Sequence, residues 1–120
     1  MTVIPKPEPG DVGYNDPITR ELDPGQQLVV TFEPRQRITE FVLPFLAMSK
    51  HPDSSYEVWM DGQRVYGPSP IPPTDIDDMV PTFIPAKRFE SRLTVYCRNL
   101  SDTTTRTYTV QPIGWEVSGE

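Results

Sequence analysis

This 120-residue chain contains one cysteine, one histidine and three lysines, and it has no long apolar run. The single cysteine, Cys97, cannot form an internal disulfide, which excludes the cross-linked framework of many small secreted domains. The longest apolar run, Phe41 to Met48, is interrupted by Pro44 and is too short to cross a bilayer. The first residues also lack the apolar core of a signal peptide. We therefore expect a soluble protein that is made inside the cell and has no membrane partner.

The shortage of histidine and cysteine also limits the chemistry that the chain can carry out. His51 lies in a predicted loop, whereas Cys97 occupies an inward position of a predicted strand, so we do not expect them to form a base and nucleophile pair. A structural zinc ion usually takes four nitrogen or sulfur ligands, and the sequence offers two such residues. The sequence has no glycine-rich phosphate loop. We therefore predict a protein that is not an enzyme and uses no cofactor.

Positive charge is scarce as well. Eleven Lys and Arg residues against 17 Asp and Glu residues give a net charge of −6, which argues against binding to nucleic acid phosphates. The charge is unevenly distributed, because residues 1–34 carry −4 and residues 61–85 carry −3, whereas residues 86–100 carry +3. Acidic and basic segments of this kind either meet across copies of the chain, as in head-to-tail assemblies, or fold back on each other within one copy.

Proline, by contrast, is abundant, and the 15 prolines are spread so widely that they exclude a long helix and favour an all-β chain. Residues 1–25 hold five of them, including Pro5, Pro7 and Pro9, and show no alternation long enough for a strand. We expect an extended N-terminal arm here, either a loosely ordered terminus or a segment that becomes ordered against a partner. Residues 26–120 are expected to form the β-domain, with a long proline-rich loop at 67–88.

Two apolar segments that follow the arm alternate with the period of a β-strand, at residues 27–33 and 38–45. A four-residue loop between them would give a hairpin with the pairs Val30 with Phe41 and Val29 with Val42. The valine pair lies on the reverse face and implies a sheet that is covered on both sides. Pro44 restricts the second strand to an edge or an end.

Asp61-Gly62 is the clearest turn signal in the sequence. This dipeptide supplies the positive φ angles of a two-residue type I′ turn, and it stands between the alternating segments 56–60 and 63–66. The predicted register turns one row inward: Tyr56, Val58, Met60, Gln63 and Val65. It turns Glu57, Trp59, Arg64 and Tyr66 outward. Trp, Arg and Tyr dominate interface hot spots, and Arg64 opposite Trp59 would add a cation–π contact. Instead of forming a protein interface, these outward side chains could pack between two sheets or form a platform for sugar binding.

The C-terminal third contains a second predicted hairpin, in which residues 101–104 form the loop. Its apolar face pairs Cys97 with Tyr108, Val95 with Val110 and Leu93 with Pro112, and its other face is polar and rich in threonine. Together with the other segments this makes about six to eight short strands. We therefore predict a β-sandwich or a jelly-roll-like barrel with an extended N-terminal arm.

Charged residues in the second half supply the remaining candidate sites. Asp75, Asp77 and Asp78 offer oxygen ligands to Ca²⁺, although their spacing lacks the glycine and the final glutamate of an EF-hand loop. The alternative is an ordinary solvated loop, so we assign no metal. The candidate interface residues are a basic strip together with the outward and arm residues, namely Lys87, Arg88, Arg92, Trp59, Arg64, Tyr66, Pro5, Pro7 and Pro9.

A short β-domain with a proline-rich arm and long proline-rich loops resembles the small structural proteins of tailed-virus particles, especially the jelly-roll decoration and accessory capsid proteins. The acidic, lysine-poor composition is similar to that of viruses of haloarchaeal hosts. The resemblance implies a virion location, a homo-oligomer, and an arm clamped over a neighbouring subunit, with copies of itself and other capsid proteins as partners. The alternative is a carbohydrate-binding or adhesin-like β-sandwich that uses Trp59, Tyr66 and the acidic loop, and a hydrolase of an unrecognised type is the third.

Overall fold

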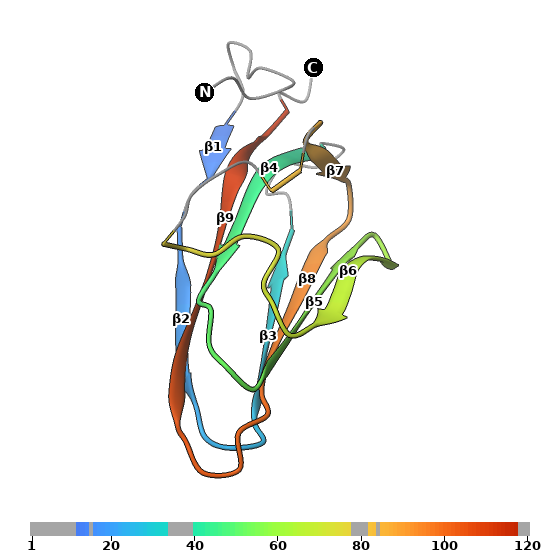
Figure 1. The fold of residues 1–120 in the computed structure, drawn as a ribbon. Coiled ribbons are helices and arrows are strands. Elements are labelled where there is room, and N and C mark those ends of the chain that lie inside the picture. The colour runs from blue at the N-terminus through green and yellow to red at the C-terminus, as the bar shows by residue number, and fades with distance from the viewer. Residues whose placement is uncertain (1–11, 15, 34–39, 78–81, 84, 118–120) are drawn as a thin grey trace.

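The computed structural model describes residues 12–14, 16–33, 40–77, 82–83 and 85–117, and in these residues it contains nine β-strands and no helix. One antiparallel sheet consists of β1 (Val12–Tyr14), β2 (Ile18–Leu22), β9 (Arg106–Glu116), β4 (Phe41–Met48) and β7 (Lys87–Phe89), with β1 and β2 both paired to β9. The other has the order β3 (Gln27–Phe32), β8 (Leu93–Asn99), β5 (Ser54–Met60), β6 (Gln63–Ser69). The two sheets face each other (Figure 1), so the predicted all-β sandwich is confirmed.

The core lies between the two sheets, and alternation of buried and outward residues is clearest in β8 and in the first half of β9. In β8, every second residue is buried, and the same holds for the first half of β9. The inward residues of the central strands include Tyr56, Val58, Val95, Cys97, Tyr108 and Val110, each with an exposed fraction of 0%. Burying a large apolar side chain contributes about 1.5–3 kcal/mol, so this layer is the main source of stability. The predicted inward faces of β5, β8 and β9 are therefore confirmed, whereas Gln63 of β6, which was also predicted to point inward, is exposed.

The predicted hairpin between residues 27–33 and 38–45 is wrong, because β3 and β4 belong to different sheets. Val30 in β3 pairs with Val95 of β8, whereas Phe41 in β4 pairs with Phe89 and Glu116. The expected pair of Val29 and Val42 does not exist either. Val29 is 46% exposed on the outside of one sheet, while Val42 is buried with Ala86 and Trp115 on the outside of the other. At this point the described residues cover the outer face of the five-stranded sheet, whereas they leave Val29 exposed on the other sheet.

The predicted C-terminal hairpin is wrong for the same reason, since β8 and β9 also lie in different sheets. Cys97 and Tyr108 do face the same core, but across the sandwich and not as neighbours in one sheet. Between β8 and β9 the chain crosses from one sheet to the other, and the buried side chain of Asn99 holds this crossing in place. Its Nδ2 donates to the carbonyl oxygens of Leu22 and Thr104 at 3.0 and 2.8 Å, and its Oδ1 accepts the N–H of Ser101 at 3.1 Å.

The Asp61-Gly62 turn is confirmed, with φ angles of 50° and 80°. The pairs of Met60 with Gln63 and of Trp59 with Arg64 are found as predicted. Beyond them the register shifts, so that Tyr66 and not Val65 lies opposite Val58. This irregularity turns Tyr66 towards the core cluster, which corrects its expected outward position.

The carboxylate of Asp61 fastens this turn to the turn between β7 and β8. It accepts the backbone N–H groups of Glu90, Ser91 and Arg92 at 2.7–3.0 Å. Burial alone would raise the pKa of Asp61, but these three hydrogen bonds outweigh it and hold the pKa below its usual value. The turn residue is therefore also a connection between distant segments of the chain.

The second half of the expected N-terminal arm is part of the sandwich. β1 and β2 form antiparallel pairs with opposite ends of β9, for example Gly13 with Trp115 and Arg20 with Tyr108. The prediction that residues 1–25 contain no strand is therefore wrong. The 11-residue strand β9 supplies a long template, so short segments with little alternation of their own form strands along it. Pro5, Pro7 and Pro9 lie outside the described residues.

The expected loop at 67–88 includes the end of β6 and the start of β7, and part of it runs along the edge of β4. The N–H of Met48 donates to Thr74, the N–H of Ile76 donates to Met48, and the N–H of Thr82 donates to Pro44. These bonds cover β4 where its pairing with β7 has ended. Pro44 itself lies at the register shift of β4, where the missing N–H does least harm.

Candidate interaction surface

The side of the four-stranded sheet that faces away from the core carries three of the predicted interface residues, Trp59, Arg64 and Arg92. We call it the outer sheet face. Because neighbouring side chains on a strand point to opposite sides, the residues between the buried positions of β3, β8 and β5 must lie here. The outer sheet face comprises Val29, Thr31, Thr94, Tyr96, Arg98, Glu57, Trp59 and Arg64, together with Arg92, which borders it directly before β8.

A shallow hollow lies on the outer sheet face, with a volume of about 320 Å³. Its lining consists of Val29, Thr31, Trp59, Gly62, Arg92, Thr94 and Tyr96. Trp59 pairs with Thr94, and Glu57 pairs with Tyr96, so the two aromatic rings occupy diagonal positions on adjacent strands. The hollow thus combines two aromatic rings, an arginine, threonine hydroxyl groups and the exposed Val29.

Glu57 holds the charged and aromatic groups of the outer sheet face in position. Its carboxylate accepts the indole N–H of Trp59 and, at 3.1 Å, a hydrogen bond from Nη1 of Arg98. The bond from Trp59 lowers the pKa of Glu57 most, burial acts in the opposite sense, and Arg98 lowers the pKa further. Arg98 also donates to the Gln27 side chain at 3.1 Å and lies 5.2 Å from the ring centre of Tyr96. These side chains are therefore ordered by one another before any partner binds.

Arg64 and Arg92 add exposed positive charge to the same face. Within the described part of the chain the ion pairs join Arg98 to Glu57 and Arg88 to Glu40, so neither Arg64 nor Arg92 is neutralised by an ion pair there. Arg64 interacts electrostatically with Glu57, and Arg92 with Asp61, so these carboxylates partly offset two guanidinium groups that remain exposed in a chain of net charge −6.

The structure divides the residues that the sequence grouped together. Trp59, Arg64 and Arg92 lie on the outer sheet face, but Tyr66 does not, and its hydroxyl donates to the Ile71 carbonyl oxygen at 2.7 Å. Lys87 and Arg88 belong to β7 in the other sheet. There they line a different hollow, together with Thr82, Phe83, Pro85 and Ala86.

Tyr96, Arg98 and Val29 are among the residues of the outer sheet face that the sequence analysis did not name as interface candidates. Alternation already placed Tyr96 and Arg98 on the face of their strand that points away from the buried side chains of Val95 and Cys97. The neighbour of that strand was assigned wrongly, however, so nothing brought Tyr96 next to Trp59. The cation–π contact is likewise made by Arg98 with Tyr96, whereas Arg64 was expected to make it with Trp59.

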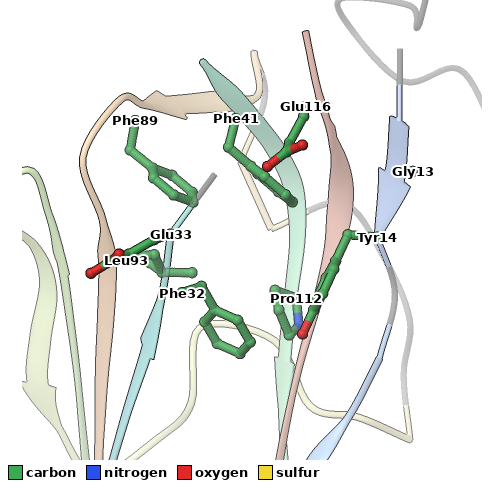
Figure 2. A pocket seen from close by; sticks show the side chains of 9 residues that line it. All are labelled: Gly13, Tyr14, Phe32, Glu33, Phe41, Phe89, Leu93, Pro112 and Glu116. Atoms are coloured by element: carbon green, nitrogen blue, oxygen red, sulfur yellow. The ribbon is translucent and has the colours of Figure 1, made fainter. Parts of the chain in front are cut away.

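An apolar pocket lies between the two sheets at the end where β1 and β7 are found, and Figure 2 shows its side chains converging from both sheets. Phe41 stacks on Phe89 with ring centres 5.1 Å apart, and Tyr14 meets Phe32 and Phe41 edge to face at 5.8 and 6.1 Å. The space left is about 30 Å³. Ligand pockets usually measure about 300–1,000 Å³, so this pocket is the end of the core and not a ligand site.

The remaining candidate residues have structural partners. His51 donates from Nε2 to the Thr107 carbonyl oxygen at 2.7 Å, and its ring lies edge-on to Tyr108. Asp75 accepts the N–H of Asp77 at 3.0 Å, while Asp78 lies outside the described residues. Among the residues that the structure describes, no three His, Cys, Asp or Glu side chains gather as metal ligands.

Comparisons with known proteins leave the outer sheet face as the main basis for a function. A scan against protein-family models and searches of curated proteins and of solved structures found nothing that matches this chain. In the described part of the chain no helix is long and apolar enough to cross a membrane. The proposal below is therefore argued from the residues of this chain alone.

Proposed function

We propose that this protein is a non-enzymatic structural protein of a virus particle, a capsid decoration or accessory protein that works through contacts with copies of itself and with other virion proteins. The observation that carries the proposal is the composition of the outer sheet face, where Trp59 and Tyr96 lie among exposed arginines. Trp, Tyr and Arg are the residues most enriched among interface hot spots. Such a face is suited to burial against another protein.

The order within this face supports the proposal further. Binding normally costs about 0.5–1.5 kcal/mol for each long side chain that has to be immobilised. Here Glu57 already holds Trp59 and Arg98 in the free protein. The cost of fixing these two side chains is then largely met during folding, and more of the contact energy remains for affinity.

The charge of the face indicates what kind of surface it contacts. Arg64 and Arg92 are exposed, whereas the chain as a whole carries −6. Complementary charges increase the rate of association and select the orientation of the partner. Acidic surfaces of other copies, or of virion proteins with similar acidic composition, fit this face. Contacts between unlike surfaces of identical subunits build rings and lattices.

Self-association and its dependence on this face test the proposal directly. Sedimentation velocity of the purified chain should show oligomers that dissociate on dilution. Trp59→Ala and Arg92→Glu should each weaken association by about 30-fold, because truncating a hot spot costs about 2 kcal/mol. Lys50→Glu is the matched control, since Lys50 is exposed on the β4–β5 loop away from the hollow. A chain that stays monomeric at every concentration refutes self-assembly.

The virion location needs its own experiment. Particles from the virus that encodes this chain are purified on a density gradient and their proteins are quantified by mass spectrometry. We expect the chain to co-sediment with the major capsid protein in a fixed ratio. Recovery only from the lysate, with none in the particle fraction, would contradict a virion structural role.

A carbohydrate-binding function is the second candidate, because the same hollow places two aromatic rings beside threonine hydroxyl groups. Aromatic rings stack on sugar faces, and hydroxyl groups bond their edges. A glycan array, read with and without a chelator, tests this function, and Trp59→Ala should remove any signal. If the wild-type protein gives no signal in either condition, this candidate is excluded.

A further inference from the structure

Strand β3 forms an open edge of the four-stranded sheet. Among the described strands it pairs only with β8, and the pairing continues without a shift from Gln27 opposite Arg98 to Phe32 opposite Leu93. Its sequence, QLVVTF, contains no glycine, no proline and no charged residue. Natural proteins usually protect an open edge with charge, proline, a bulge or a short strand, because such an edge recruits further strands.

The other edges of the described sheets show that protection. β6 contains Gly67 at a φ of 78° and Pro68, and its pairing with β5 shifts register twice. β1 and β7 are three residues long, and β2, which pairs only with β9, carries the charged Arg20 and Glu21. β4 is covered by the segment around residues 74–76 and by Thr82 and Phe83. The unprotected edge of β3 is therefore a local exception.

The hydrogen bonds of β8 determine which groups of β3 point to the open side. The N–H of Asn99 donates to the carbonyl oxygen of Gln26, and the N–H of Leu100 on the other side donates to Asp53. Antiparallel ladders alternate, so Leu28, Val30 and Phe32 direct their backbone groups to β8. The N–H and C=O groups of Gln27, Val29 and Thr31 then point away from the sheet.

We propose that β3 pairs antiparallel with β3 of a second copy around a two-fold axis at Val29, which joins the two sheets into one. Val29 would lie opposite Val29 of the second copy, and Gln27 opposite Thr31. Each such pair exchanges both backbone bonds, which gives about six new hydrogen bonds. The inference rests on the proposed function, since it identifies one contact through which copies assemble.

A second copy fits this edge better than an unrelated segment, because the edge is self-complementary. The paired β3 strands contain no charged side chain, so no like charges meet within the new strand pair, even though the chain has a net charge of −6. It also covers Val29, which is 46% exposed, with the identical side chain of the other copy. Val29 and Thr31 line the hollow as well, so the two hollows would adjoin across the axis and extend the outer sheet face.

Residue-resolved amide exchange, measured by NMR at high and low protein concentration, tests this pairing. At high concentration we expect the amides of Gln27, Val29 and Thr31 to be protected, and on dilution their exchange should accelerate at least about tenfold as the copies separate. The amides of Leu28 and Val30 are the internal controls, because β8 protects them in both states.

A pair of variants at one position supplies the second test. Val29→Pro removes an N–H that points away from β8, so it should leave the sheet intact and abolish pairing between copies. Val29→Thr keeps the N–H and should associate like the wild type. If Val29→Pro does not fold, the exchange pattern of the wild type decides alone.

The outcomes separate this inference from the proposed function. An oligomer in which Gln27, Val29 and Thr31 exchange as fast as in the monomer overturns the β3 contact and leaves assembly through another part of the outer sheet face. A chain that is monomeric at all concentrations overturns both. An oligomer in which the amides of Gln27, Val29 and Thr31 are protected, and which no longer forms when Val29 is replaced by Pro, supports both the β3 contact and the proposed function.

Discussion

Asn99 should be the most sensitive polar residue of this fold. It is fully buried, and its side chain makes three hydrogen bonds, to the backbone of Leu22, Ser101 and Thr104. These bonds fix the point where the chain leaves β8 in one sheet and enters β9 in the other. Replacing Asn99 by Ala removes all three bonds and leaves their backbone partners in place.

The size of the effect follows from the surroundings of those partners. A buried polar group that loses its hydrogen bond costs about 1–3 kcal/mol. Leu22 and Ser101 are buried, whereas Thr104 is exposed and its carbonyl can bond to water. We therefore count two full penalties and expect Asn99→Ala to lower the free energy of unfolding by about 2–6 kcal/mol. This is a large part of the roughly 5–15 kcal/mol that stabilises a typical domain.

Urea unfolding followed by tryptophan fluorescence measures this loss. With a denaturant dependence of about 1–3 kcal/mol per molar, the midpoint should fall by roughly 2 M. Thr103→Ala is the matched control, because Thr103 is exposed in the same turn, and it should change stability by less than about 0.5 kcal/mol. If the two variants differ by less than about 1 kcal/mol, the hydrogen bonds of Asn99 do not hold the crossing.

Three further predictions concern other parts of the sandwich. The folded-state pKa of Asp61 is lowered, so the stability that its carboxylate contributes should be present above its unfolded pKa and lost as the pH falls through the folded pKa. The variant Asp61→Asn retains a turn-forming residue but has no carboxylate. Its urea midpoint should therefore change less between about pH 6 and pH 3 than the midpoint of the wild type. Burial raises the pKa of Cys97 to about 12, so its thiol should resist alkylation at pH 8 in the folded protein and react once urea is added. A Cβ on Gly114 would lie 2.1 Å from the Val42 carbonyl oxygen, so Gly114→Ala should destabilise by more than about 3 kcal/mol, whereas Gly13→Ala, with open space around it, should be tolerated.

Each of these predictions has an outcome that contradicts it. Equal acid sensitivity of Asp61→Asn and the wild type would show that the three backbone bonds do not depend on the charge of Asp61. Rapid alkylation of Cys97 without denaturant would mean that the core opens readily. A stable Gly114→Ala protein would require β4 and β9 to separate locally at no great cost.

The candidate surface was only partly predictable. Trp59 and Arg64 were placed together from the sequence, because the Asp61-Gly62 turn fixes the pairs next to it. Tyr66 was misplaced by one irregularity only a few residues from that turn. Tyr96 could not be added, since it comes from a strand about 40 positions away whose neighbour was unknown.

What the sequence determined by itself was local. Period-two alternation decided which side chains of β3, β5, β8 and β9 enter the core, and the positive φ angles of Asp-Gly decided one turn. Only the tertiary structure decided which strands are neighbours. The inward side chains of a strand can be buried whether the next strand pairs beside it in the same sheet or packs across the sandwich in the other sheet. Alternation therefore cannot distinguish a hairpin from a crossing between sheets. Here the buried hydrogen bonds of Asn99 and the long template of β9 favour the crossing, and that choice creates both the outer sheet face and the open edge of β3.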